Sequence, residues 1–117
     1  MAATVSLTID QGGTFSRNIT WKAGTPKVAV DLSGYTAALH VRSSASSSSL
    51  LLSLTSSNGG ITISPSQGKF TLNASAAQTK KLAPGRYAYE LKATSSGGQV
   101  TPLMKGAFTV IAEVTKL

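Results

Sequence analysis

The sequence predicts an all-β protein, a sandwich or barrel of short strands, and three observations support this prediction. Apolar and polar residues alternate along most of the 117-residue chain, which is typical of strands that bury one side. Clusters of glycine, proline, asparagine and serine interrupt the alternation at intervals of about 8–12 residues. Serine, threonine, glycine and valine are abundant, whereas aspartate and glutamate total only 4. The length suits a single domain, residues 1–117, with one modest core.

Each expected strand is defined by apolar residues two positions apart, which lie on one side of an extended chain. About eight or nine short antiparallel strands result. In chain order, their apolar residues are Val5, Leu7 and Ile9; Phe15, Ile19 and Trp21; Val28 and Val30; Tyr35, Ala37, Leu39 and Val41; Leu50, Leu52 and Leu54; Ile61 and Ile63; Phe70 and Leu72; Tyr87, Tyr89, Leu91 and Ala93; and Val100, Met104 and Phe108, in a strand reaching about Val114. Arg17 intrudes on the apolar side of the second strand.

Turn-forming residues separate these strands at 10–13, 23–26, 58–60, 65–68 and 95–98. Segments 65–68 and 95–98 are short enough to close hairpins. Asp31–Gly34 is expected to form a further turn, with Gly34 supplying the backbone freedom. The strand after this turn is expected to direct four side chains outward, namely Thr36, Ala38, His40 and Arg42.

Two segments depart from the alternation. Residues 75–82 contain good helix formers, with Asn73 or Ser75 as the N-cap and Ala83–Gly85 as the stop. We expect a helical turn here that crosses between the two sheets, closes one end of the sandwich and points Leu82 into the core. The serine-rich segment 43–49 is expected to be a flexible loop, although a loop on a rigid scaffold also suits contact with a partner.

No set of residues indicates catalysis. The four acids, Asp10, Asp31, Glu90 and Glu113, suggest no converging pair, and Glu90 shares the polar side of its strand with Arg86 and Lys92. His40 is the only histidine and cysteine is absent, so a catalytic triad, a zinc site and thiol chemistry are not expected. The paired glycines precede strands rather than helices, which excludes phosphate-binding loops. We therefore expect no enzyme, cofactor or metal.

The net charge of +7 reflects scarce acids more than abundant bases, because the 11 lysines and arginines are scattered. An acidic protein surface is the expected partner rather than nucleic acid, since the tyrosines and Trp21 share strand sides with apolar residues. The first ten residues lack the features of a signal peptide, and no apolar run is long enough to span a membrane. The lack of cysteine further disfavours secretion.

A scaffold of this kind acts through its surfaces. We select five residues as candidate contacts with other proteins: His40 and Arg42 on an outer strand face, and Lys80, Lys81 and Arg86 as the densest basic group. Strand edges also suit strand addition and assembly. Segment 1–9 is expected to pair within its own sheet, and pairing with a neighbouring subunit is the alternative.

Several motifs resemble a known group of proteins. They are Gln11–Phe15 leading to Trp21, the Asp31–Gly34 turn before a strand ending in Arg42, Pro84–Leu91, and Lys105–Val110. Together they are similar to the small immunoglobulin-like β-sandwich proteins of tailed bacteriophages, including the N-terminal domain of baseplate upper proteins. The resemblance covers roughly residues 8–112 and is carried by structural motifs.

This resemblance implies a structural component of a virion, assembled in the host cytoplasm and present in many copies or as a homo-oligomer. Its partners would be other capsid, neck or tail proteins. Baseplate upper proteins continue into a receptor-binding region, whereas this sequence ends at Leu117, so we expect a head decoration, collar or adaptor role. The alternative is a receptor- or carbohydrate-binding module of a phage fibre, which would require exposed aromatic side chains.

Overall fold

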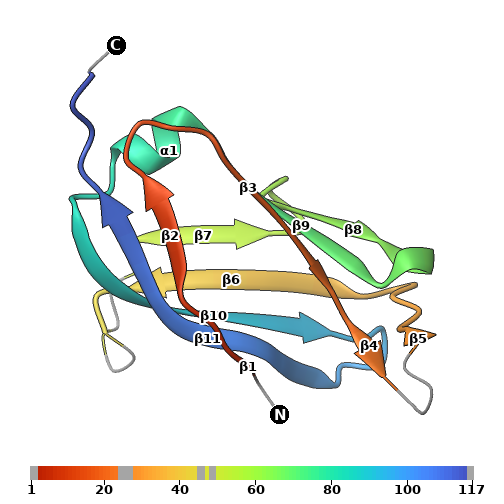
Figure 1. Cartoon of the computed structure of the whole chain (residues 1–117). Helices are drawn as coiled ribbons and strands as arrows, with labels where there is room; N and C mark the ends of the chain where they lie inside the picture. The colour runs from red at the N-terminus through yellow and green to blue at the C-terminus, as the bar shows by residue number, and fades with distance from the viewer. Residues whose placement is uncertain (1–2, 24–27, 45–46, 48–49, 116–117) are drawn as a thin grey trace.

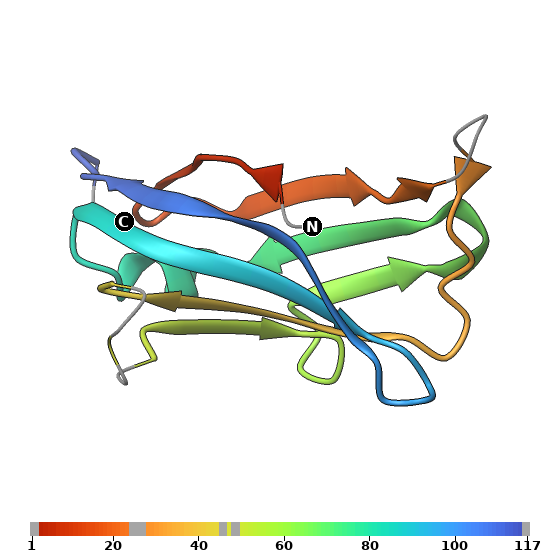
Figure 2. The same cartoon turned by 90° about the horizontal axis from the view of Figure 1, so that it is seen from below.

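The computed structural model describes residues 3–23, 28–44, 47 and 50–115, and it contains two β-sheets packed face to face (Figure 1, Figure 2). The larger sheet has the order β1-β11-β10-β6-β7, with β2 also beside β11, and the smaller has the order β3-β9-β8. Strands β4 and β5 form a separate pair. The strands are β1 Ala3–Thr4, β2 Leu7–Asp10, β3 Phe15–Thr20, β4 Lys22–Ala23, β5 Val28–Ala29, β6 Thr36–Arg42, β7 Leu52–Thr55, β8 Ile61–Ser64, β9 Lys69–Ala74, β10 Gly85–Thr94 and β11 Val100–Ile111.

Alternate residues of both sheets form one hydrophobic core. The fully buried side chains include Phe70 and Leu72 of β9 in the smaller sheet, and Leu39, Leu91 and Phe108 in the larger sheet. The rings of Phe15 and Tyr89 both pack edge-on against Phe108, which links β3 to β10 and β11 across the core. The alternation in the sequence therefore identified most inward-facing positions correctly, whereas Val28 and Val100, also predicted to face inward, are 62% and 53% exposed.

Strand β6 follows the predicted pattern residue by residue. Ala37, Leu39 and Val41 are buried, and the residues between them face outward. The turn before β6 is also as predicted: Asp31 Oδ1 accepts hydrogen bonds from the N–H and the hydroxyl of Ser33, at 3.0 and 2.7 Å. These two bonds lower the pKa of the Asp31 carboxyl from its usual range. Gly34 follows with a φ of 79°, the left-handed region that glycine favours.

The two predicted hairpin connections are present, whereas the turn predicted at 23–26 lies outside the described residues beyond Ala23. Residues 65–68 close the β8–β9 hairpin around a 3₁₀ turn, Pro65–Gln67, and residues 95–98 close the β10–β11 hairpin. The predicted helical turn is α1, Ala76–Lys80, which connects β9 of one sheet to β10 of the other at one end of the sandwich (Figure 1). The predicted flexible loop 43–49 lies largely outside the described residues.

Residues around α1 fix it against the sheets. Ser75 caps the helix in a capping box with Gln78, and Leu82 is only 5% exposed, as its predicted core position requires. The buried hydroxyl of Thr79 donates to the carbonyl of Gly13 at 2.7 Å, so α1 is attached to the turn between β2 and β3. This end of the sandwich is therefore closed by packing and by hydrogen bonds.

The all-β sandwich is as the sequence predicted, and the start of β10 carries a tyrosine corner. The hydroxyl of Tyr87, near the start of β10, donates to the carbonyl of Ala83 four residues upstream. This tyrosine corner is characteristic of immunoglobulin-like sandwiches, in which the tyrosine precedes the second disulfide cysteine by two residues. Here Tyr89 occupies that position, and its aromatic packing contributes to the core in place of a disulfide. Burial raises the pKa of the Tyr89 phenol, and the nearby Arg17 guanidinium opposes that rise.

The sheet differs from the prediction in three respects. The sandwich is antiparallel, as predicted, except at one edge, where β1 and β2 run parallel to β11. No tight hairpin joins these segments, so either direction was open to them. The described residues form eleven strands rather than about eight or nine, since short pieces such as β4 and β5 count separately. Leu50 and Val114, assigned to strands from sequence, are 45% and 95% exposed and lie outside them.

Candidate functional site: a basic depression on the larger sheet

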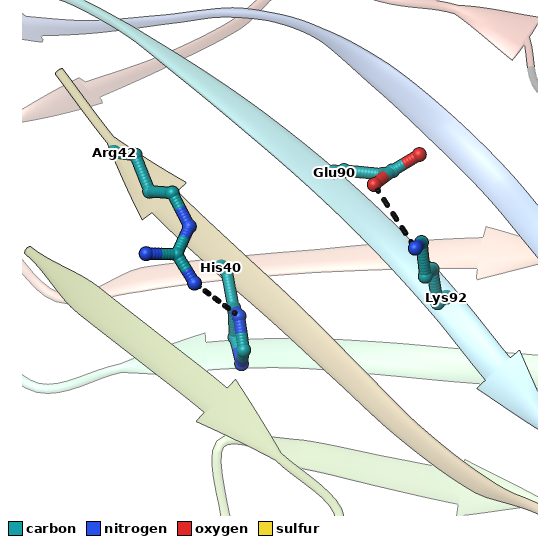
Figure 3. Close-up of polar contacts among 4 residues, drawn as sticks. All are labelled: His40, Arg42, Glu90 and Lys92. Atoms are coloured by element: carbon teal, nitrogen blue, oxygen red, sulfur yellow. Dashed lines mark hydrogen bonds and ion pairs between the residues drawn. The ribbon is translucent and has the colours of Figure 1, made fainter. Parts of the chain in front are cut away.

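The outer face of the larger sheet has a shallow depression of about 490 Å³ over β6, β10 and β11. It is lined by Ala38, His40, Arg42, Ser44, Ala88, Tyr89, Glu90, Lys92 and Lys105. His40 and Arg42 extend from β6 and Glu90 and Lys92 from β10 (Figure 3). The depression therefore combines long charged side chains with small ones on a rigid sheet.

Strand pairing explains both the hollow and the charge. Ala38 lies opposite Lys92, and Ala88 lies opposite Arg42, so each long basic side chain faces an alanine on the next strand. The alanines leave the surface low between these side chains. Glu90 lies between two partners, opposite His40 on β6 on one side and opposite Lys105 on β11 on the other. Neighbouring strands thus place an imidazole, a carboxylate and an ammonium group in one row.

Glu90 is the single carboxylate among these lining residues. Its Oε1 lies 3.6 Å from Nζ of Lys92, and the two side chains are 42% and 49% exposed. An exposed pair of this kind contributes little to stability, because water screens it and both side chains lose freedom. Arg42 and Lys105 add two further cations, so the depression carries a net positive charge.

The contact between Arg42 and His40 indicates which ring nitrogen of the imidazole accepts a hydrogen bond. Nη2 of Arg42 lies 3.3 Å from Nδ1 of His40. A guanidinium has only N–H donors, so Nδ1 must accept this hydrogen bond and the ring proton must lie on Nε2. In this tautomer the Nε2–H of His40 is a further hydrogen-bond donor.

The depression is rich in hydrogen-bond donors. The guanidinium, the two ammonium groups and the imidazole N–H are all hydrogen-bond donors, which suits carboxylates of a partner. Among the described residues, no group of three or more histidine, cysteine, aspartate or glutamate side chains is placed to hold a metal ion. Within the same part of the chain, no helix has the length and apolar character needed to cross a membrane.

The structure brings together two of the five residues selected from the sequence. His40 and Arg42 meet in the depression. Lys80 and Lys81 lie exposed at the end of α1 and do not line it. Arg86 is exposed near the start of β10, in the same alternation phase as Glu90, and is also not among the lining residues. The sequence therefore located one part of this surface.

Sequence reasoning did not select Glu90, Lys92 and Lys105 as contact residues. The shared phase of Glu90 and Lys92 on one strand was visible in the sequence. Their position beside His40 was not, because it depends on β10 pairing with β6, and Lys105 joins only through β11. In comparisons with known proteins, no family model matches the chain and no curated protein shows significant similarity to it.

Proposed function

We propose that the protein is a non-enzymatic structural component of a tailed-phage particle, acting by assembly with other virion proteins. The role is that of a head decoration, a neck or collar protein, or an adaptor of the tail or baseplate. The protein is present in many copies, and its partner is a larger virion protein. The motif resemblance described above and the immunoglobulin-like sandwich support this proposal.

The observation that carries the binding role is the basic depression. Three cations, Arg42, Lys92 and Lys105, surround one carboxylate on a rigid sheet. Because the half-exposed Glu90–Lys92 pair neutralises only part of this charge, an acidic partner gains from docking here. Small residues between the cations allow a partner's carboxylate to approach the sheet closely.

A receptor- or carbohydrate-binding role on a phage fibre is less well supported. Such a site would need solvent-facing aromatic rings, and the chain has one tryptophan, three tyrosines and three phenylalanines. All seven side chains are buried or half-buried. Trp21 and Tyr35 pack edge-on against each other with ring centroids 6.0 Å apart, and Tyr89 is 3% exposed. The basic face therefore remains the better candidate for contact.

Particle association tests the proposal directly. Phage particles from the source culture are purified on a density gradient, and each fraction is probed with an antibody to this chain. We expect the protein in the particle band, at many copies per particle. Particles that lack it, with all of the protein in the soluble fractions, would refute the virion role.

A variant then tests the contact face. In Arg42→Glu/Lys105→Glu the cationic face becomes acidic, so we expect incorporation to fall at least about tenfold, because like charges would meet across the interface. Lys80→Glu/Lys81→Glu at the end of α1, which makes the same change in net charge, is the matched control. Equal loss in both variants would show that the depression is not the contact.

A further inference from the structure

Two edge strands on opposite sides of the sandwich, β7 of the larger sheet and β3 of the smaller sheet, differ in whether a side chain covers their backbone groups. At the β7 side, Oδ1 of Asn58 accepts from the N–H of Thr55 at 2.9 Å, and its Nδ2 donates to the carbonyl of Ser53 at 3.0 Å. One amide side chain thus takes the place of a neighbouring strand along the outer edge of β7. Blocking an edge in this way protects it against pairing with another chain.

The opposite side ends in β3, and the edge of this strand is open. The N–H of Trp21 donates to the carbonyl of Gly68 at 2.8 Å, which fixes the phase of the β3–β9 ladder. Alternate residues of an antiparallel strand bond to opposite sides, so the N–H and C=O groups of Ser16, Asn18 and Thr20 point away from β9. Among the described residues, these backbone groups have no hydrogen-bond partner.

The edge is open because the first strands pair elsewhere. In immunoglobulin-like sandwiches the equivalent sheet commonly has a further strand beside β3. Here β1 and β2 instead pair with β11 in the larger sheet, while β3 pairs only with β9. Figure 1 and Figure 2 both show β2 and β3 on the same side of the sandwich, in separate layers. On the side away from β9, β3 therefore has no neighbouring strand among the described residues.

The side chains of β3 define what such a strand must carry. Phe15 and Ile19 are half-buried and pack on the core, and Arg17 lies between them in the same phase, opposite buried Leu72. Arg17 is exposed and makes no hydrogen bond or ion pair with any residue that the structure describes. In a newly added antiparallel strand, these three residues would form the non-hydrogen-bonded pairs, in which opposing side chains approach most closely.

A charged residue on the inward side of an edge strand disfavours pairing with most strands and favours pairing with a strand of opposite charge. An apolar strand added to β3 would cover the Arg17 guanidinium without a partner, which costs several kcal/mol in desolvation. A strand with a carboxylate opposite Arg17 avoids this cost and gains a charged pair. Arg17 therefore rejects indiscriminate edge pairing and admits one class of strand.

We propose that the open edge of β3 binds an extended segment of another protein with the pattern apolar–x–acidic–x–apolar. The backbone bonds to the outward N–H and C=O groups of residues 16, 18 and 20, the acidic side chain pairs with Arg17, and the apolar side chains cover Phe15 and Ile19. The site is separate from the basic depression and does not depend on the virion role.

The chain's own sequence favours a different protein over a second copy as the occupant. Each of the four acids would need apolar residues two positions away on both sides. Asp10 is flanked at this spacing by Thr8 and Gly12, and Glu90 by Ala88 and Lys92. Asp31 has Ser33 on one side, and Glu113 has Thr115. None of the four matches the pattern.

A synthetic peptide tests the proposal on the intact protein. The probe carries Val-Thr-Glu-Thr-Val between solubilising residues, and a matched peptide has Gln in place of Glu. We expect the Glu peptide to bind with at least about tenfold higher affinity, measured by fluorescence anisotropy. Amide hydrogen exchange should slow at Ser16, Asn18 and Thr20 when the peptide is present. Failure of the Glu peptide to bind, or protection elsewhere, would overturn the proposal.

Three variants test separately the charge of Arg17 and the backbone hydrogen bonds of β3. Arg17→Glu should reverse the preference, so that a Lys peptide binds better than the Glu peptide. Asn18→Pro removes an outward N–H without removing a bond to β9 and should abolish binding, whereas Asn18→Ala keeps the N–H and should bind. Arg86→Glu, on the outer face of the other sheet, makes the same change in charge and is the matched arginine control.

Folding of every variant is confirmed by circular dichroism. If Asn18→Pro fails to fold, the charge reversal at residue 17 still decides the question. A loss of affinity for the Glu peptide in Arg86→Glu equal to that in Arg17→Glu would contradict the assigned site. Self-association of the wild type in sedimentation experiments, abolished by Asn18→Pro, would identify a second copy as the occupant and overturn the choice of partner.

Discussion

Replacement of Gly106 by alanine tests how the N-terminal strand is held on the sandwich. Gly106 lies directly opposite Tyr89 on β10, and the Tyr89 hydroxyl donates to the carbonyl of Val5 at 2.7 Å, on the far side of β11. A Cβ atom at residue 106 would clash with that same carbonyl oxygen, and the φ of Gly106 is 153°. The substitution therefore places a methyl group where the backbone of the first strand lies.

The expected cost follows from two contributions. A non-glycine residue held in this backbone region costs about 1–3 kcal/mol. Displacement of Val5 also breaks its hydrogen bond with Tyr89, which contributes about 1 kcal/mol. The total of about 2–4 kcal/mol compares with an overall stability of about 6–18 kcal/mol for a domain of 117 residues. Gly106→Ala should therefore fold but be clearly less stable.

Urea denaturation followed by intrinsic fluorescence measures the effect. With a slope typical of small domains, the transition midpoint should fall by about 1–2 M. Tyr89→Phe isolates the hydrogen bond and should cost about 0.5–1.5 kcal/mol. Gly97→Ala is the matched control, because its Cβ would meet only Ser95 Oγ at 3.9 Å and its φ is not positive. Equal stability of Gly106→Ala and Gly97→Ala would refute this account of the β1–β11 contact.

Three further predictions concern single contacts. Asn58→Ala removes the side chain that covers the edge of β7, so the free energy of unfolding measured by denaturation should fall by about 2 kcal/mol. Self-association measured by sedimentation should increase. A variant that stays a stable monomer would contradict the role of Asn58 in covering this edge. Tyr87→Phe should lower the free energy of unfolding by about 0.5–1.5 kcal/mol, and an unchanged urea midpoint would exclude a contribution from the tyrosine corner. Because the hydrogen bonds from Ser33 lower the pKa of Asp31 in the folded protein, they stabilise the turn at pH values above the unfolded pKa of the carboxyl. This stabilisation is lost as the pH falls through the folded pKa. Carbon NMR titration should show a lower Asp31 pKa in the wild type than in Ser33→Ala.

The inward positions of the fold were predictable because they depend on local periodicity. The alternation around Leu39 and Leu91 identified their buried sides without knowledge of which strands are neighbours. The capping residue Ser75 and the stop after residue 82 likewise act over a few residues, and the helical turn was found. Features set by neighbouring residues in the chain were therefore accessible from sequence.

Strand order and direction were not predictable in the same way. The parallel pairing of β2 with β11 joins segments about one hundred residues apart, and nothing local to Leu7–Asp10 encodes the direction of its partner. The site depends on this kind of information too. Lys105 reaches the row with Glu90 and His40 only because β10 lies between β11 and β6.

Arg17 shows how the local alternation along a strand and the pairing of distant strands act together. In the sequence it conflicts with the apolar side of its strand, and a conflict of this kind is costly unless the global fold accommodates it. The structure accommodates it because β3 has no neighbour on one side, so the guanidinium reaches solvent between half-buried Phe15 and Ile19. An alanine or valine would complete the apolar strip and remove the conflict, but it would also leave an unguarded edge. Asn58 shows that the fold can cover an edge strand, here β7 of the larger sheet, and the charged, uncovered edge of β3 fits the proposed pairing with another strand.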